Sequence, residues 1–234
     1  PAIRTEAADS RTGTHTGAAD GETVIRDTVA CTNLIKGKEY FLAGMLMDKK
    51  TGEPVKDGLG REIRSELTFT AEAANCEKVL EFKTEGADLA GSTVVAFETL
   101  LYKDTEVAVH ADLKDADQSV SYPSMKTEAV DEGTGDHVGA VSERTMIRDK
   151  VTCEGLVKGK EYTISGILMK QSDGEPLKDQ DGGEITAELT FTAQAAREEQ
   201  VLTFSLNTSL LQGETVVAFE TLYQEDRQAA VHAD

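Results

Sequence analysis

One short run of the chain brings together side chains that could exchange protons. It begins at His110, continues through Asp112, Asp115 and Asp117, and ends at Gln118. An imidazole titrates near neutrality and can carry protons between neighbouring groups. The three aspartates could form a turn, or a weak calcium site without the spacing of an EF-hand loop. For Asp112 and Asp117 we expect the turn, and we predict no metal site.

The run ends a stretch of sequence that is present twice. The segment Gly37–Tyr40 returns 122 residues later as Gly159–Tyr162. All four histidines follow the same offset: His15 matches His137, and His110 matches His232. We therefore predict two domains, 1–122 and 123–234. Since the second copy has no counterpart of residues 113–122, we expect it to be truncated before its last strand.

Each copy is expected to be built from short strands. Segments rich in Val, Thr, Phe and Leu alternate with clusters of Gly, Asp, Asn and Lys, which is typical of strands and turns. In the first copy the expected strands are 23–32, 40–47, 63–70, 79–82, 93–101 and 106–111, with further strands near both ends of the copy. This spacing predicts an all-β fold of two tandem immunoglobulin-like (pilin-like) antiparallel β-sandwich domains.

Charge and composition exclude several partners. The chain carries 24 Lys and Arg against 43 Asp and Glu, a net charge of −19. Nucleic acid and anionic membrane surfaces would repel it. No stretch approaches the roughly 18 apolar residues of a membrane-spanning helix. Cys31, Cys76 and Cys153 form no metal-ligand pattern, and we expect all three to be free and mostly buried.

Several motifs together resemble a known family. The string Val-Ala-Phe-Glu at 95–98 is repeated at 217–220, and the His110 to Gln118 run follows the first copy of it. Thr5-Glu6-Ala7 precedes it, as does an Asp-containing strand at 25–29. This combination resembles the VaFE-type ester-bond-forming repeats of Gram-positive surface adhesins, and the resemblance covers nearly all of the first copy.

The resemblance implies a covalent cross-link inside the domain. In that family the hydroxyl of a first-strand threonine attacks the side-chain amide of a last-strand glutamine, releases ammonia and leaves an ester. The matching positions are Thr5 as nucleophile and Gln118 as electrophile. Such a bond would survive reducing agents and would let an extracellular protein do without paired cysteines.

Acidic residues and a histidine assist in that family, and the matching positions are Asp27, Glu98 and His110, with Asp115 as a supporting acid. A threonine hydroxyl is a weak nucleophile until a base removes its proton, and a primary amide is a poor acceptor until its oxygen is polarised. Two carboxyls close together in an apolar interior cannot both ionise cheaply, so one can donate a proton while the other accepts one. Taken singly, Glu98 could instead face solvent on an alternating strand, and His110 could be structural.

The second copy keeps Thr127, Asp149, Glu220 and His232, but the position of its glutamine, 240, lies beyond the chain. On this sequence it is not expected to close its own ester. Two explanations stay open: it takes a last strand from another chain by β-strand addition, or the chain has been cut short.

We therefore expect a structural stalk module of an extracellular, cell-wall-anchored adhesin, which uses no cofactor and contacts neighbouring repeats of the same stalk. The cross-linking is a single-turnover reaction of the domain on itself, not enzymatic turnover. One alternative is an immunoglobulin-like binding module for a host protein or glycan, which an exposed aromatic patch would support. Others are a Lys-to-Asn isopeptide cross-link, and a hydrolase, for which the sequence has neither a nucleophile elbow nor a metal motif.

Overall fold

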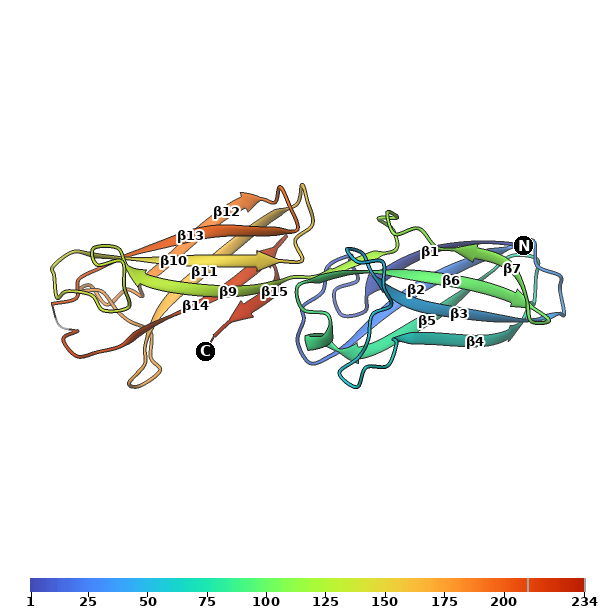
Figure 1. Cartoon of the computed structure of the whole chain (residues 1–234), viewed down its shortest axis with the longest axis horizontal. Helices are drawn as coiled ribbons and strands as arrows, with labels where there is room; N and C mark the ends of the chain where they lie inside the picture. The colour runs from blue at the N-terminus through green and yellow to red at the C-terminus, as the bar shows by residue number, and fades with distance from the viewer. Residues whose placement is uncertain (210, 234) are drawn as a thin grey trace. The chain divides into compact units, whose positions relative to one another are not determined.

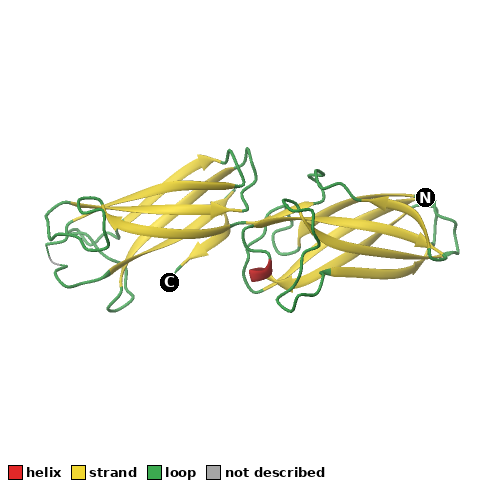
Figure 2. Cartoon of the chain, in the orientation of Figure 1, coloured by secondary structure: helices red, strands yellow, loops and turns green. Residues whose placement is uncertain are grey.

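The computed structural model describes residues 1–209 and 211–233, and the chain divides into two compact units, Pro1–Tyr122 and Pro123–Asp234 (Figure 1). Strands and their connecting loops make up nearly all of the described chain, with one short 3-10 helix, η1 (Gly86–Asp88) (Figure 2). Among the described residues no helix is long and apolar enough to cross a membrane.

Unit 1 is a sandwich of two antiparallel sheets. One sheet has the order β1-β2-β5, and the other has the order β4-β3-β6-β7 with β8 also paired to β6. The strands are β1 (Ala2–Asp9), β2 (Glu22–Thr32), β3 (Glu39–Asp48), β4 (Arg64–Thr70), β5 (Cys76–Glu85), β6 (Ser92–Tyr102), β7 (Thr105–His110) and β8 (Ser119–Tyr122).

Unit 2 repeats this architecture with the sheets β9-β10-β13 and β12-β11-β14-β15. Its strands are β9 (Ser124–Asp131), β10 (Thr145–Glu154), β11 (Glu161–Lys170), β12 (Thr186–Thr192), β13 (Arg197–Leu206), β14 (Val216–Gln224) and β15 (Arg227–His232). Both units are thus antiparallel β-sandwiches, which confirms the predicted fold class.

Alternation along the strands builds the core of each sandwich. On β3, Tyr40, Leu42, Gly44 and Leu46 are buried, and the alternate residues between them are only partly buried. Successive side chains of a strand point to opposite faces, so every second residue reaches the space between the sheets. The same rule applies to polar residues, and it determines which of them become buried.

A glycine in the middle of β3 makes room for the core. A Cβ added to Gly44 would lie 2.6 Å from Leu80 Cδ1 and 2.7 Å from the Phe82 ring. Gly44 is also the register partner of Glu98 on β6. Directly opposite residues of an antiparallel pair share one face of the sheet, so Glu98 points toward the interior.

The hairpin between β6 and β7 determines the position of a histidine. Lys103 and Asp104 both have positive φ, 51° and 61°, as a two-residue turn of type I′ requires. The register that follows contains one irregularity, between Leu100 and Leu101, and ends with His110 opposite Glu98. Turn geometry thereby brings an imidazole and a carboxyl to the same end of the hairpin.

The three cysteines are free, as predicted; Cys31 and Cys153 are buried and Cys76 is partly buried. Cys31 lies directly opposite Cys76 in the pairing of β2 with β5. Burial, with a smaller contribution from Cys76, raises the pKa of the Cys31 thiol to about 11. Such a thiol carries little of the reactive thiolate at neutral pH.

Candidate functional site

Thr5 and Gln118 meet in the interior of unit 1. Thr5 lies on β1 with its side chain inward and is only 4% exposed, and Gln118 is fully buried. The Gln118 Nε2 group donates a hydrogen bond to Thr5 Oγ1. The two residues that the family resemblance singled out, one near each end of the unit, are therefore in direct contact.

The backbone beside Gln118 holds this contact in place from both sheets. Ala7 N on β1 donates to Asp117 O at 2.8 Å, and Ala96 N on β6 donates to Gln118 O at 3.1 Å. Gln118 itself lies in the turn just before β8, one residue ahead of the strand on which it was expected. The regular pairing with β6 begins only at Ser119, opposite Val95.

His110 also contacts the Thr5 hydroxyl. Its Nδ1 atom is 3.3 Å from Thr5 Oγ1, and its Nε2 atom is 3.1 Å from Asp115 Oδ2. A neutral imidazole that donates its Nε2–H to Asp115 presents an unprotonated Nδ1 to the threonine. This arrangement suits a base that is oriented by a carboxylate.

Asp27 and Glu98 form a buried carboxyl pair next to the reacting groups. Asp27 is fully buried and Glu98 is 1% exposed, so Glu98 does not face solvent. Burial raises the pKa of Asp27 to about 6. Burial, and then the charge of Asp27, raise the pKa of Glu98 to about 10. At neutral pH Glu98 therefore keeps its proton while Asp27 is ionised.

The hydrogen bonds around Asp27 and Glu98 are consistent with one proton on the pair of carboxyl groups. Glu98 Oε2 accepts from Gln118 Nε2 at 2.6 Å. Neither oxygen of Asp27, nor Glu98 Oε1, has a hydrogen-bond donor among the described residues. Buried oxygens without a donor are costly, and a proton held between the two carboxyl groups supplies one of these oxygens with a donor.

The acidic run before Gln118 forms a turn. Asp112 Oδ1 accepts from Lys114 N and Asp115 Oδ1 accepts from Asp117 N, both at 2.9 Å. Within 1–209 and 211–233, no group of three His, Cys, Asp or Glu side chains is arranged to hold a metal ion.

One buried polar pair was missed from the sequence. Tyr122 OH on β8 donates to Asp9 Oδ2 on β1 at 3.0 Å, and both residues are buried. Burial and then Asp9 raise the pKa of the Tyr122 phenol far above its usual range. The sequence contained one signal for this pair: Asp9 is repeated in the second copy as Asp131.

Unit 2 brings together the four matching side chains that it contains. Thr127 Oγ1 lies 3.2 Å from His232 Nδ1, which is 3.5 Å from Glu220 Oε2. Asp149 is fully buried and Glu220 is 1% exposed. Burial, followed by the interaction with Asp149, raises the pKa of Glu220 to about 9.

Comparison with known proteins identifies both copies. The model of the family described as "T-Q ester bond containing domain" matches residues 1–122 and 123–234. A search of curated proteins finds no match to the chain.

Solved structures show low similarity. An adhesin from Mobiluncus mulieris, described as containing intramolecular disulfide, isopeptide and ester bond cross-links, is 14% identical with a TM-score of 0.44; the match covers 96% of this chain and 80% of that one. The C-terminal domain of the AgI/II polypeptide BspA from Streptococcus agalactiae is 8% identical with a TM-score of 0.40, over 97% and 96% of the two chains. With such low identities and TM-scores, nothing about function follows from these structures.

Proposed function

We propose that unit 1 joins Thr5 to Gln118 through an ester that the domain forms by itself. The premise is that the chain belongs to the family of T-Q ester bond containing domains, whose model matches both units. The observation that carries the proposal is the direct, buried contact between Gln118 Nε2 and Thr5 Oγ1. Two reactants held by a fold in contact need no further loss of translational freedom, which lowers the barrier to their reaction.

The reaction begins at the threonine hydroxyl. His110 Nδ1, 3.3 Å from Thr5 Oγ1, takes the hydroxyl proton as the oxygen attacks Gln118 Cδ. The new Oγ–Cδ bond gives a tetrahedral intermediate. His110 then returns the proton to the departing nitrogen, the Cδ–N bond breaks, and ammonia leaves. Asp115 stabilises the imidazolium that forms between these two proton transfers, as a carboxylate beside a catalytic histidine does.

The carboxyl pair activates the amide. The oxygen and nitrogen of an amide exchange places by a half-turn of the group, which brings the Gln118 oxygen to the position beside Glu98. A protonated Glu98 then donates to the oxygen that becomes negative in the intermediate, while the ionised carboxylate of Asp27 acts only as a hydrogen-bond acceptor. The pair is buried, so these interactions act in a low dielectric.

The domain is consumed by its own reaction. Thr5 and Gln118 end as the two halves of one ester, so no free catalyst is regenerated and one bond forms per domain. This is single-turnover cross-linking and not the activity of an enzyme on a substrate.

The cross-link suits a stalk module of a cell-surface adhesin anchored to the Gram-positive cell wall. It joins β1 to the segment before β8, so tension that enters unit 1 near its start leaves near its end through covalent bonds. Tandem copies of such a unit would contact one another along an extracellular stalk. The acidic surface expected from a net charge of −19 favours solubility over binding to anionic surfaces.

Nothing in the described residues favours the other functions considered. The large hydrophobic residues that are exposed include no aromatic side chain, so an aromatic binding patch is missing. The buried polar residues there include neither lysine nor asparagine, which an internal isopeptide bond would use.

Intact mass under denaturing and reducing conditions tests the proposal. The chain should be lighter than its sequence by one ammonia, and Thr5→Ala and Gln118→Ala should each restore the full mass. A wild-type chain of full mass would rule out the ester.

Two matched variants locate the bond. Thr127→Ala, the equivalent change in unit 2, should leave the deficit of one ammonia unchanged. Thr5→Ser keeps a hydroxyl at the same position and should keep the deficit. A deficit that disappears in Thr127→Ala and survives in Thr5→Ala would place the bond in unit 2 instead.

A further inference from the structure

Two of the three cysteines lie side by side in unit 1. Cys31 on β2 and Cys76, the first residue of β5, are register partners in the antiparallel pairing of these two strands. Directly opposite residues of an antiparallel pair have Cα atoms about 4.5 or about 5.5 Å apart, depending on their place in the hydrogen-bond ladder. A disulfide requires a separation of roughly 4.4 to 6.8 Å. The two strands therefore hold these cysteines at a distance that a disulfide can bridge.

The two thiols lie on the same face of the sheet. Cys31 is 1% exposed, and Cys76 packs against the same core. Two pairs further along the strands, Asp27 lies opposite Leu80, and both of these residues are buried. Since every second residue of a strand points the same way, Cys31 and Cys76 also point toward the interior. After burial, the charge of Cys76 and a hydrogen bond with it raise the pKa of the Cys31 thiol to about 11, so the two thiols are close enough to interact.

Backbone hydrogen bonds keep the two cysteines together. The regular pairing of β2 with β5 continues on one side of the pair. On the other side, just beyond the end of β2, Leu34 N donates to Ala74 O at 2.9 Å. In its free form the Cys31 thiol donates to Val29 O at 4.0 Å, and a thiol is a weak donor. Little is therefore lost when the Cys31 sulfur turns toward Cys76.

Cys76 is accessible to a reagent in solution, whereas Cys31 is not. β5 lies at the edge of the sheet β1-β2-β5, and Cys76 is only partly buried. The residues before it, 72–75, are all exposed. Cys31 lies on the central strand of the sheet and is buried. An oxidant therefore meets Cys76 first, and Cys31 is placed to react with what forms there.

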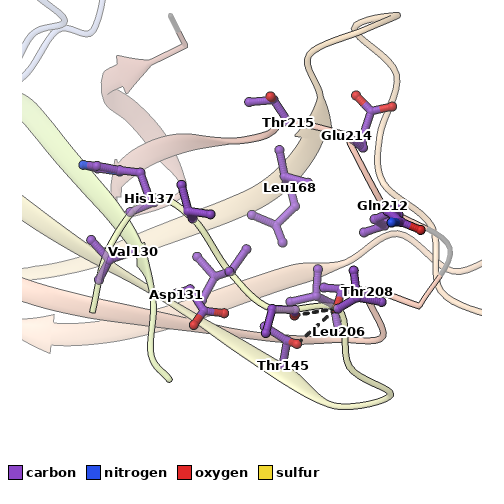
Figure 3. Close-up of a pocket in the computed structure, with 18 of the residues that line it drawn as sticks. Val130, Asp131, His137, Thr145, Leu168, Leu206, Thr208, Gln212, Glu214 and Thr215 are labelled. Atoms are coloured by element: carbon purple, nitrogen blue, oxygen red, sulfur yellow. Dashed lines mark hydrogen bonds between the residues drawn. The ribbon is translucent and has the colours of Figure 1, made fainter. Parts of the chain in front are cut away.

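Unit 2 contains the inner cysteine without its partner. Cys153 matches Cys31 and is fully buried, and it lies between Met125 on β9 and Glu198 on β13. Glu198 stands where unit 1 has Cys76. A cavity of about 530 Å³ lies in unit 2 (Figure 3), and none of the described residues that line it is a cysteine. Cys153 is therefore expected to remain a free thiol.

We propose that Cys31 and Cys76 form a disulfide between β2 and β5, a cross-link separate from the ester, when the chain meets an oxidant of the small-molecule disulfide class. The Cys76 sulfur loses its proton and attacks one sulfur of the oxidant, which releases one thiol and leaves a mixed disulfide. The Cys31 sulfur then loses its proton, attacks the Cys76 sulfur and releases the second thiol. Two S–H bonds of the protein give one Sγ–Sγ bond, and the disulfide of the oxidant is reduced to two thiols.

The disulfide would act on a different part of the sheet from the ester. β1 and β5 are the two edge strands of the sheet β1-β2-β5. The ester would fix β1 through Thr5, and the disulfide would tie β5 to the central strand β2. The residue opposite Cys31 on β1 is Ile3, two residues before Thr5. Because thiols reduce a disulfide and leave an ester intact, unit 1 would have one permanent cross-link and one reversible cross-link.

Intact mass after incubation with oxidised glutathione tests the inference. The incubation is made at about pH 8, near the usual pKa of a cysteine. The wild-type chain should lose the mass of two hydrogen atoms and regain it on reduction. Alkylation of the denatured chain should find a free thiol at Cys153 alone, and peptide mapping without reductant should join Cys31 to Cys76. The mass is followed until it is constant, because a thiol with a pKa of about 11 attacks slowly.

Three variants and an unfolding measurement sharpen the test. Cys153→Ala should leave the loss of two hydrogen atoms unchanged, and Cys76→Ser should abolish it. Thr5→Ala cannot form the ester and should still form the disulfide. In denaturant unfolding, oxidation should lower the unfolding equilibrium constant of unit 1 by roughly 30 to 1000-fold and leave that of unit 2 unchanged.

Several results would overturn the inference. These are a wild-type chain that stays fully reduced, a chain that keeps glutathione on Cys76 as the final product, a dimer joined through Cys76, and a loss of two hydrogen atoms that survives Cys76→Ser. The ester is judged separately by the loss of ammonia. A chain with the ammonia deficit and no disulfide would sink this inference alone, and a disulfide without the ammonia deficit would sink the ester alone.

Discussion

Units 1 and 2 share a nucleophile, a histidine and a carboxyl pair, and they differ in what surrounds them. The threonine-to-histidine distances are 3.3 Å in unit 1 and 3.2 Å in unit 2. Thr5 is 4% exposed, whereas Thr127 is partly exposed. The side-chain cluster therefore forms without a glutamine beside it, and the burial of its threonine accompanies the presence of β8.

This difference separates two parts of the site. The carboxyl pair depends on the packing of the two sheets, because Asp27 and Asp149 lie on the central strands β2 and β10 and are fully buried in both units. The position of the Gln118 amide depends on the segment that leads into β8, whose backbone is hydrogen-bonded to both sheets in unit 1. The sandwich prepares the proton carriers, and the end strand delivers the amide and excludes water.

The largest expected difference between the units is in stability. An ester between Thr5 and Gln118 spans a separation of 113 residues, and chain-entropy arguments for cross-links of that length give about 4 to 5 kcal/mol. In chemical unfolding, Thr5→Ala should lower the free energy of unfolding of unit 1 by about this amount. Thr127→Ala should leave the transition of unit 1 in place, and equal effects of the two variants would contradict the comparison.

The next effect concerns the rate of ester formation. Glu98→Gln keeps the size of the side chain but removes its acidic proton, so the reaction should slow by roughly 10² to 10⁴-fold. The loss of ammonia from freshly translated chain, followed by mass, measures this rate. Glu220→Gln is the matched change in unit 2 and should not alter it. An unchanged rate in Glu98→Gln would remove the carboxyl from the mechanism.

The pH profile of the same reaction should have two limbs. Below about pH 6 Asp27 is protonated and no longer acts as an ionised hydrogen-bond acceptor, so the rate falls as pH decreases. Near pH 10 Glu98 loses the proton that it donates, so the rate falls again as pH increases. A rate that keeps rising through pH 10 would exclude Glu98 as the acid.

The smallest effect should be equal in the two units. Asp104 and Asp226 occupy matching hairpin turns with φ of 61° and 63°, a backbone conformation that glycine adopts without strain. Asp104→Gly and Asp226→Gly should each stabilise their unit by about 0.5 to 1 kcal/mol in denaturant unfolding. Effects of opposite sign would mean that the two hairpins do not play the same structural role.

Much of this protein is determined by its sequence alone. The 122-residue repeat, the strand periodicity and the turn residues predict two antiparallel sandwiches, because alternation along a strand decides which side chains reach the core. The family motifs led to Thr5, Gln118 and His110, since a reaction of this kind needs a nucleophile, an acceptor and a proton carrier. Local patterns of residue type are sufficient for the fold, and the roles of the three side chains follow from the family resemblance.

The tertiary structure decided the rest. Glu98 follows Val-Ala-Phe on an alternating strand, so its sequence neighbours also allowed an exposed carboxyl. Its burial depends on Gly44 opposite it and on Asp27 from the other sheet, neither of which is near it in sequence. The Asp9–Tyr122 bond likewise depends on which distant segments lie side by side. Burial, pKa and accessibility are properties of the packed sheets, and no single stretch of the chain contains them.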